Sequence, residues 1–241
     1  METGETFAKR CQALSGVLRM LGLRRRLKTC AVVGGSGILR QHPRGREIDA
    51  HEAVLRVNNC PVGGFEHLVG SRTSVRFLNG PRSIIWGRQI AQQKGRRPVP
   101  PPELTRNDHV VVWGDLGTLD RLKSALPRNA SVVRANTRFR RECADKTFWS
   151  AEELDAHRAS NGVPRLEITF GFEAVAHALY ACEEVNIYGF FLGHDDAKRQ
   201  TNAAASGSGK AMEVPYHYYE NQTYDKSAKD PWRPWTYRFH N

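Results

Sequence analysis

The chain has 241 residues, of which 40% are hydrophobic and 25% are charged, values that suit one soluble globular domain able to bury a core. Lys and Arg number 36 against 25 Asp and Glu, and the formal charge of +11 favours anionic partners such as polyanions, anionic membranes or acidic small molecules. The chain has no zinc-finger spacing and no RNA-binding aromatic motif, which argues against a nucleic-acid module. A solvated basic surface explains the charge equally well.

Five cysteines are present, at positions 11, 30, 60, 143 and 182, and none forms a CxxC pair, so no zinc site is expected. Glycosylation sequons begin at Asn129 and Asn221 and would matter only in a secretory protein. No apolar run is long enough to span a bilayer, and the chain does not start with a signal peptide. A membrane anchor is therefore expected only outside this chain.

Hydrophobic patterning predicts strands alternating with helices. Apolar residues at spacings of three and four predict a helix over 5–23. Short apolar runs predict strands at 30–33, 53–57, 73–78, 110–113, 131–134 and 185–188, and a helix is predicted over 115–126. This alternation indicates an α/β domain on a mostly parallel sheet, in which ligands bind beyond the carboxyl ends of the strands.

Two glycine-containing segments adjoin predicted helices. The turn at 34–37 follows the first strand, and a helix start is expected at Ile38, which would create an anion site of free backbone N–H groups. A further helix is predicted after Gly171. Its expected apolar face consists of Phe172, Val175, Ala176, Leu179 and Cys182.

Four motifs occur in a recognisable order. The first runs from Cys30-Ala-Val-Val-Gly-Gly-Ser-Gly through Gly45-Arg-Glu-Ile-Asp-Ala-His51 and Val54-Leu-Arg-Val-Asn58 to Val69-Gly-Ser-Arg-Thr73. It resembles the L sialylmotif of the eukaryotic-type sialyltransferases, glycosyltransferase family 29. The segment from Gly171 through Cys182 to Tyr188-Gly-Phe190 resembles the S motif. His217-Tyr-Tyr-Glu220 is similar to motif III, and His240-Asn241 is similar to the start of motif VS, whose glutamate would lie beyond the last residue.

The resemblance implies a fold and a reaction. The fold would be a Rossmann-like, mostly parallel central sheet flanked by helices, a GT-A-like sialyltransferase variant. Residues 1–241 would form a single catalytic domain, with 1–29 as a helical lead-in and an end inside motif VS. The reaction would move sialic acid from CMP-sialic acid to a galactose or N-acetylgalactosamine hydroxyl of a glycan, with inversion and without metal or other cofactor. The expected location is the Golgi lumen, in a type II membrane protein.

The resemblance also implies residue roles. His240 would be the general base, and His217 would donate to the donor phosphate. The CMP-sugar would be bound by Gly35, Ser36, Asn58, Thr169, Gly171, Gly189 and His217. Cys30 and Cys182 would form a disulfide. Asp49 and His51 are expected to be a structural hydrogen-bonded pair that supports the L-motif loop.

The sequence departs from the family pattern at two places. Gly35 stands where the family usually has asparagine, and Thr169 keeps the only hydroxyl of the usual Pro-Ser-Thr-Gly opening of the S motif. Two alternatives therefore remain open: a transferase of another CMP-linked acidic sugar, such as a ketodeoxy-octonate or ketodeoxy-nonulosonate, and a catalytically impaired homologue that binds CMP or glycan. Residues 80–160 and 194–214 match no motif, so the acceptor and linkage are not predicted.

Overall fold

The computed structural model describes residues 17–93, 99–104, 109–127, 130–135, 169–190, 215 and 217–220. Within them, no helix is both long enough and apolar enough to cross a membrane.

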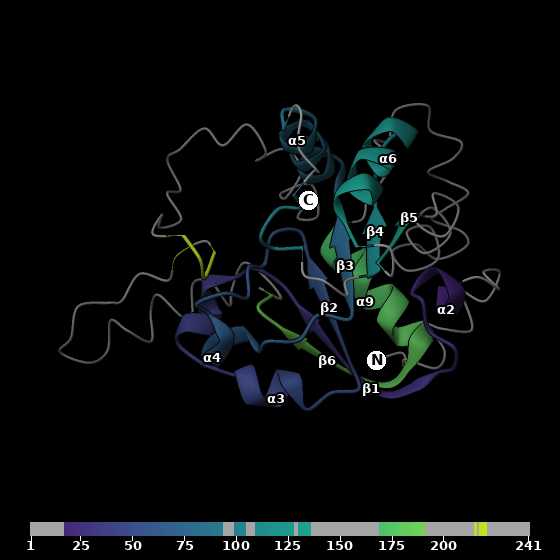
Figure 1. The fold of residues 1–241 in the computed structure, drawn as a ribbon. Coiled ribbons are helices and arrows are strands. Elements are labelled where there is room, and N and C mark those ends of the chain that lie inside the picture. The colour runs from purple at the N-terminus through teal and green to yellow at the C-terminus, as the bar shows by residue number, and fades with distance from the viewer. Residues whose placement is uncertain are drawn as a thin grey trace, which may run out of the picture.

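Six parallel strands form the sheet shown in Figure 1. In chain order they are β1 (Leu27–Val33), β2 (Ala53–Val57), β3 (Val75–Leu78), β4 (His109–Val112), β5 (Ser131–Arg134) and β6 (Cys182–Tyr188). The order across the sheet is β5-β4-β3-β2-β1-β6, and every neighbouring pair is parallel. β2 and β3 are buried throughout, which is why their sequences are nearly continuous apolar runs. The predicted α/β fold with a parallel sheet is confirmed.

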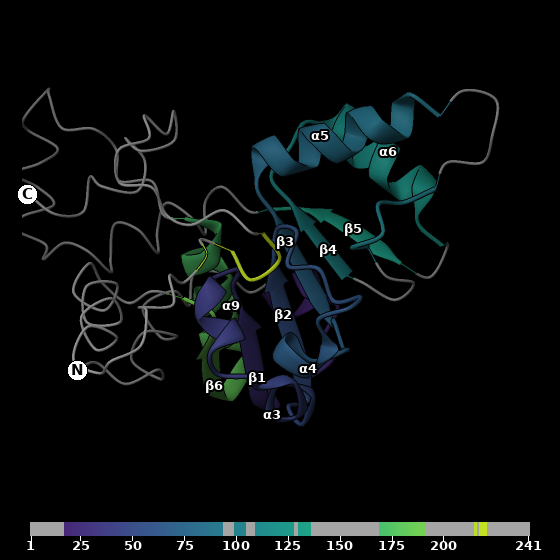
Figure 2. The ribbon, with the colours of Figure 1, turned by 90° about the vertical axis from the view of Figure 1, so that its left-hand side faces the viewer.

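Helices cover both faces of the sheet. They are α2 (Val17–Met20), the 3₁₀ turn η1 (Gly37–Arg40), α3 (Gly45–Asp49), α4 (Glu66–Val69), α5 (Gly80–Ala91), α6 (Leu116–Ala125) and α9 (Phe170–Ala181). In Figure 2, α5 and α6 lie together beside β4 and β5, whereas α3 and α4 lie near β1 and β2. Side chains of Asn79, Asp115 and Thr169 accept the hydrogen bonds that cap α5, α6 and α9.

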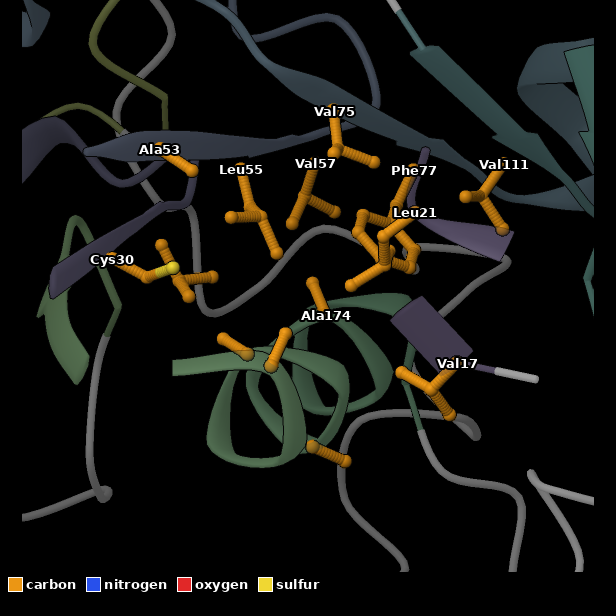
Figure 3. Packing of buried hydrophobic residues seen from close by; sticks show 14 of the residues in the cluster. Val17, Leu21, Cys30, Ala53, Leu55, Val57, Val75, Phe77, Val111 and Ala174 are labelled. Carbon is orange, nitrogen blue, oxygen red and sulfur yellow. The ribbon is translucent and has the colours of Figure 1, made fainter. Parts of the chain in front are cut away.

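Alternate residues of each strand enter different parts of the core. Cys30, Leu55 and Phe77 belong to the cluster that packs against α9 and α2, as Figure 3 shows. On the other face, Val33 of β1 and Val54 of β2 pack with residues of η1, α3 and α4. Leu78 of β3 and the even-numbered valines of β4 pack with α5 and α6. The sheet is thus the middle of three layers.

The prediction of which face of the helix after Gly171 is buried is wrong, because α9 is rotated about its axis relative to the expectation. Its fully buried residues are Phe170, Glu173, Ala174, Ala176, His177, Ala178 and Ala181. Of the expected face, Ala176 and Cys182 are buried, but Phe172, Val175 and Leu179 are only half-buried. Small alanine side chains let this helix approach the sheet closely, and that contact decides which side faces inward.

The helix expected at Ile38 is only one 3₁₀ turn, capped by Ser36, whose hydroxyl accepts a hydrogen bond from the Ile38 N–H. That N–H is therefore already used, and a full helix N-terminus does not follow the glycine turn. The strand predictions agree with the structure to within three residues at each end. The helix predicted over 5–23 is described only from Val17 to Met20.

A disulfide joins Cys30 of β1 to Cys182, the first residue of β6, with 6.0 Å between the two Cα atoms. This distance is ordinary for a disulfide, and the pairing implied by the resemblance is confirmed. The bond lies among residues that face α9 (Figure 3).

Candidate functional site

The candidate site begins where the strand order reverses. Strands β1 to β5 follow one another toward one edge of the sheet. The chain then returns, and β6 pairs with the opposite edge of β1. Just beyond the strand ends, the Gly34 N–H donates to the Tyr188 oxygen at 2.8 Å, and the Ser36 N–H donates to the Gly189 oxygen at 3.1 Å. Ligands of open parallel sheets bind at the carboxyl edge at such a reversal. The glycine turn and Gly189 therefore meet where an α/β sheet usually holds its ligand.

Close backbone contact at this point requires glycine. A Cβ atom on Gly34 would collide with the carbonyl oxygen of Gly189, and Gly189 itself has a φ of +69°. A Cβ atom on Gly189 would in turn meet the packed Leu39 side chain and the carbonyl oxygen of Gly34. Main-chain atoms and a packed leucine cannot move aside freely. The two strand ends can approach this closely only because neither residue has a side chain.

Gly34→Ala is expected to destabilise the protein by about 1–3 kcal/mol, because the new methyl group must push the Gly189 carbonyl away. Gly63→Ala is the matched control, since a Cβ there meets no atom within 4 Å. Its effect should remain within about 0.5 kcal/mol. Denaturant unfolding of both variants measures the difference, and equal stabilities would show that the close approach is not required.

His217 is brought to the same edge by pairing with the glycine turn. Ser36 and His217 form an antiparallel bridge, and the Tyr218 N–H donates to the Gly35 oxygen at 3.0 Å. Tyr218 is fully buried, and its hydroxyl donates to the Pro61 oxygen at 2.6 Å. This buried tyrosine anchors the segment, so the half-buried His217 is held next to the turn although Ser36 and His217 are 181 positions apart in the chain.

The imidazole of His217 is oriented by two neighbours. Its Nδ1 lies 2.7 Å from Oε2 of Glu220, and its ring stacks on Tyr219 with centroids 4.9 Å apart. Because an ionised carboxylate only accepts hydrogen bonds, Nδ1 carries the proton of this contact, and the carboxylate fixes which way the ring faces. Glu220 had no predicted role, although its spacing within His217-Tyr-Tyr-Glu220 was visible in the sequence.

The unusual glycine at position 35 has a structural consequence. A Cβ atom on Gly35 would lie 2.9 Å from Cδ2 of His217. The absence of a side chain lets the imidazole lie directly over the turn. Glycine in place of the family's asparagine at position 35 thus lets His217 lie close to the backbone of the turn.

Asn58 follows β2 at the same edge. Val33 is the register partner of Arg56, so Asn58 extends β2 to about the level of Gly35. Asn58 adopts a left-handed backbone with a φ of +54°, and its Oδ1 accepts a hydrogen bond of 3.0 Å from the Asn79 N–H. Asparagine tolerates this conformation better than most residues.

The amino end of α9 reaches this edge through Phe190. The Phe190 ring touches the positions where Cβ atoms of both Gly34 and Gly171 would lie. Thr169 stands one residue before the helix, and its hydroxyl accepts from the Phe172 N–H at 3.2 Å. The structure therefore brings Gly35, Ser36, Gly171, Gly189 and His217 together, with Thr169 and Asn58 on elements that end at the same edge.

Asp49 and His51 do have structural roles, but no hydrogen bond between the two is found in the described chain. Asp49 accepts from Ser71 and Arg72, including the Ser71 N–H at 2.8 Å. His51 Nδ1 lies 2.9 Å from the Glu47 oxygen, and its Nε2 lies 3.0 Å from Nδ2 of Asn186 in β6. Asp49 and His51 therefore do not form the expected pair. Each one holds a different part of the chain through its own hydrogen bonds. His240, the expected general base, lies outside the described residues.

Comparison with known proteins identifies the family. The sequence pattern of "Glycosyltransferase family 29 (sialyltransferase)" matches residues 3–233. Sialyltransferase-like protein 2 of Oryza sativa subsp. indica is 30% identical over 90% of this chain and 54% of its own length. A chicken (Gallus gallus) CMP-N-acetylneuraminate-beta-galactosamide-alpha-2,3-sialyltransferase 1 is 31% identical over 74% of this chain and 49% of its own.

A beta-1,6-galactosyltransferase of Arabidopsis thaliana is also similar, with 27% identity over 85% of this chain and 48% of its own length. The chain spans about half the length of the curated relatives it matches. Because the family pattern covers nearly all of the chain, the chain belongs to glycosyltransferase family 29, the sialyltransferase family.

Proposed function

We propose that this protein transfers sialic acid from CMP-sialic acid to a galactose or N-acetylgalactosamine hydroxyl of a glycan. The observation that carries the proposal is the pairing of His217 with Ser36 at the reversal of strand order, where the glycine turn and Gly189 also meet. Family membership supports glycosyl transfer, and the location of these residues supports a nucleotide-sugar site at this edge.

The chemistry is a single displacement with inversion. His240 takes the proton of the acceptor hydroxyl, whose oxygen forms a bond to the anomeric carbon of the donor. The bond from that carbon to the phosphate oxygen breaks at the opposite face, and the electron pair leaves with CMP. In this step both ring nitrogens of His217 carry a proton: Nδ1 donates to Glu220, which holds the imidazole in place, and Nε2 donates to the phosphate as its negative charge develops.

CMP carries only one phosphate, so the proposed reaction uses no metal and no other cofactor. The proposed partners are the nucleotide sugar and the glycan, not a nucleic acid. The Cys30–Cys182 disulfide is compatible with an oxidising compartment, and we propose the Golgi lumen.

Two other donors compete with sialic acid. The altered opening of the S motif favours testing another CMP-linked acidic sugar. Because one of the relatives is named a beta-1,6-galactosyltransferase, a nucleotide-activated galactose also belongs in the donor panel. A catalytically impaired homologue that binds CMP or glycan is the remaining alternative.

A transfer assay of the full-length protein tests these possibilities. We expect turnover with CMP-sialic acid on at least one galactose or N-acetylgalactosamine acceptor, and unchanged turnover in the presence of EDTA. Turnover only with another donor would replace sialic acid by that donor. Binding of CMP without turnover on any acceptor would favour the impaired homologue, and loss of turnover with EDTA would overturn the metal-free reaction.

A further inference from the structure

Two arginines lie opposite each other inside the sheet. Arg56 of β2 and Arg76 of β3 are register partners, and both are fully buried. Burying two cations side by side is unfavourable, and hydrogen bonds to the guanidinium groups offset part of that cost. These two register positions place two guanidinium groups, which are strong hydrogen-bond donors, inside the sheet.

The two guanidinium groups bond to different segments. Nη2 of Arg56 donates to the carbonyl oxygens of Val69 at 2.7 Å and Arg72 at 2.8 Å. Nη1 of Arg76 donates to the carbonyl oxygens of Asn58 at 2.8 Å and Asn59 at 2.6 Å. Of the two arginines, Arg76 is the one whose bonds reach the turn that carries Asn58, the candidate nucleotide contact.

Arg76 stabilises an uncommon backbone conformation. With a φ of +54°, Asn58 directs its own carbonyl and that of Asn59 toward one nitrogen atom of Arg76. The Asn58 N–H donates to Phe77 at 2.7 Å and its Oδ1 accepts from Asn79, so the orientation of the side-chain amide is fixed. Because Oδ1 must face the Asn79 N–H, the amide nitrogen Nδ2 is the remaining donor.

We propose that Arg76 is a positioning residue for the donor phosphate: it holds the Asn58–Asn59 turn so that Nδ2 of Asn58 donates to the phosphate of the nucleotide. The proposal rests on the proposed function, in which Asn58 binds the CMP-sugar. The buried positive charge of Arg76 adds an attraction for the phosphate, which is stronger in a protein interior than in water. Arg76 itself does not touch the nucleotide.

The test compares the affinities of CMP and cytidine, which differ by the phosphate alone. Arg76→Lys keeps the charge but cannot reproduce the same pair of carbonyl bonds. We expect it to weaken CMP binding about tenfold or more, the scale of a hydrogen bond to a charged group, while cytidine affinity stays within about twofold. Arg56→Lys is the matched control, with the same burial and a register position opposite, and it should leave the ratio of the two affinities unchanged.

A second variant keeps the proposal testable if Arg76→Lys does not fold. Asn59→Pro leaves Arg76 intact but pushes residue 58 toward an extended backbone, because proline restricts the residue before it. The same selective loss of CMP affinity is expected. Circular dichroism and thermal melting identify any variant that is unfolded.

The outcomes separate the two proposals. A wild-type protein that does not prefer CMP over cytidine contradicts the proposed function. A wild-type preference that survives in a folded Arg76→Lys protein, or in a folded Asn59→Pro protein, overturns the role of Arg76. An equal fall in both affinities would also overturn it, because Arg76 would then only maintain the fold.

Discussion

Removing the Cys30–Cys182 disulfide is expected to lower the free energy of unfolding by about 2–5 kcal/mol. The bond joins residues 152 positions apart, so its loss greatly increases the conformational freedom of the unfolded chain. Typical domains are stable by only about 5–15 kcal/mol, and the change is therefore a large share of the total. Denaturant unfolding of the double variant Cys30→Ala/Cys182→Ala in a non-reducing buffer measures it.

Cys60→Ala provides the control for losing a buried thiol, since Cys60 is free and fully enclosed. Its cost should be about 1 kcal/mol, the usual scale for a small core deletion. A reductant should lower the stability of the wild-type protein and narrow its difference from the double variant. If the double variant unfolds at the same denaturant concentration as the oxidised wild type, the bond does not constrain the fold.

The parallel sheet could be predicted because each central strand is buried on both faces. Such strands are short, continuous apolar runs, as Cys30-Ala-Val-Val33 and Val110-Val-Val112 illustrate. α5 was missed because its sequence starts with Gly80 and Pro81 and mixes arginines with apolar residues. Its signals were the capping side chain of Asn79 and a proline in the first turn, both typical of a helix start.

The buried face of α9 could not be read from polarity. Glu173 and His177 are fully buried on the side that faces the sheet, where a periodicity argument places apolar residues. His177 lies against Phe77, and burial lowers its pKa to about 4, so it is neutral at physiological pH. Its Nδ1 lies 2.7 Å from the Glu173 carbonyl oxygen. Which polar residues become buried depends on such tertiary partners.

In the candidate site too, the sequence identified residues but not their tertiary contacts. Resemblance to known motifs identified His217 and the glycine turn, but not what holds them together. The bridge from Ser36 to His217 and the bond from Tyr218 to Pro61 join segments far apart in the chain. Arg76 left a visible signal, a charge inside an otherwise apolar strand, but its partners follow only from the folded backbone.

Substituting His240 and His217 in turn separates their roles in the proposed mechanism. His240→Ala in the full-length protein should lower turnover by about a hundredfold or more, the scale of a general base, and should leave CMP affinity almost unchanged. His217→Ala should weaken both turnover and CMP binding, because its Nε2 faces the phosphate in the proposed complex. Single-turnover rates and equilibrium binding of CMP, measured side by side, distinguish these effects.

Glu220→Gln serves as the graded control for His217. The glutamine oxygen can still accept the Nδ1 proton, but the charge that orients the imidazole is gone. Its turnover should therefore fall between those of the wild type and His217→Ala, with the same accompanying loss of CMP affinity. If removing His240 leaves turnover intact while removing His217 abolishes it, then His240 is not the base. His217, already paired with a carboxylate at the edge of the sheet, would then have to accept the proton of the acceptor.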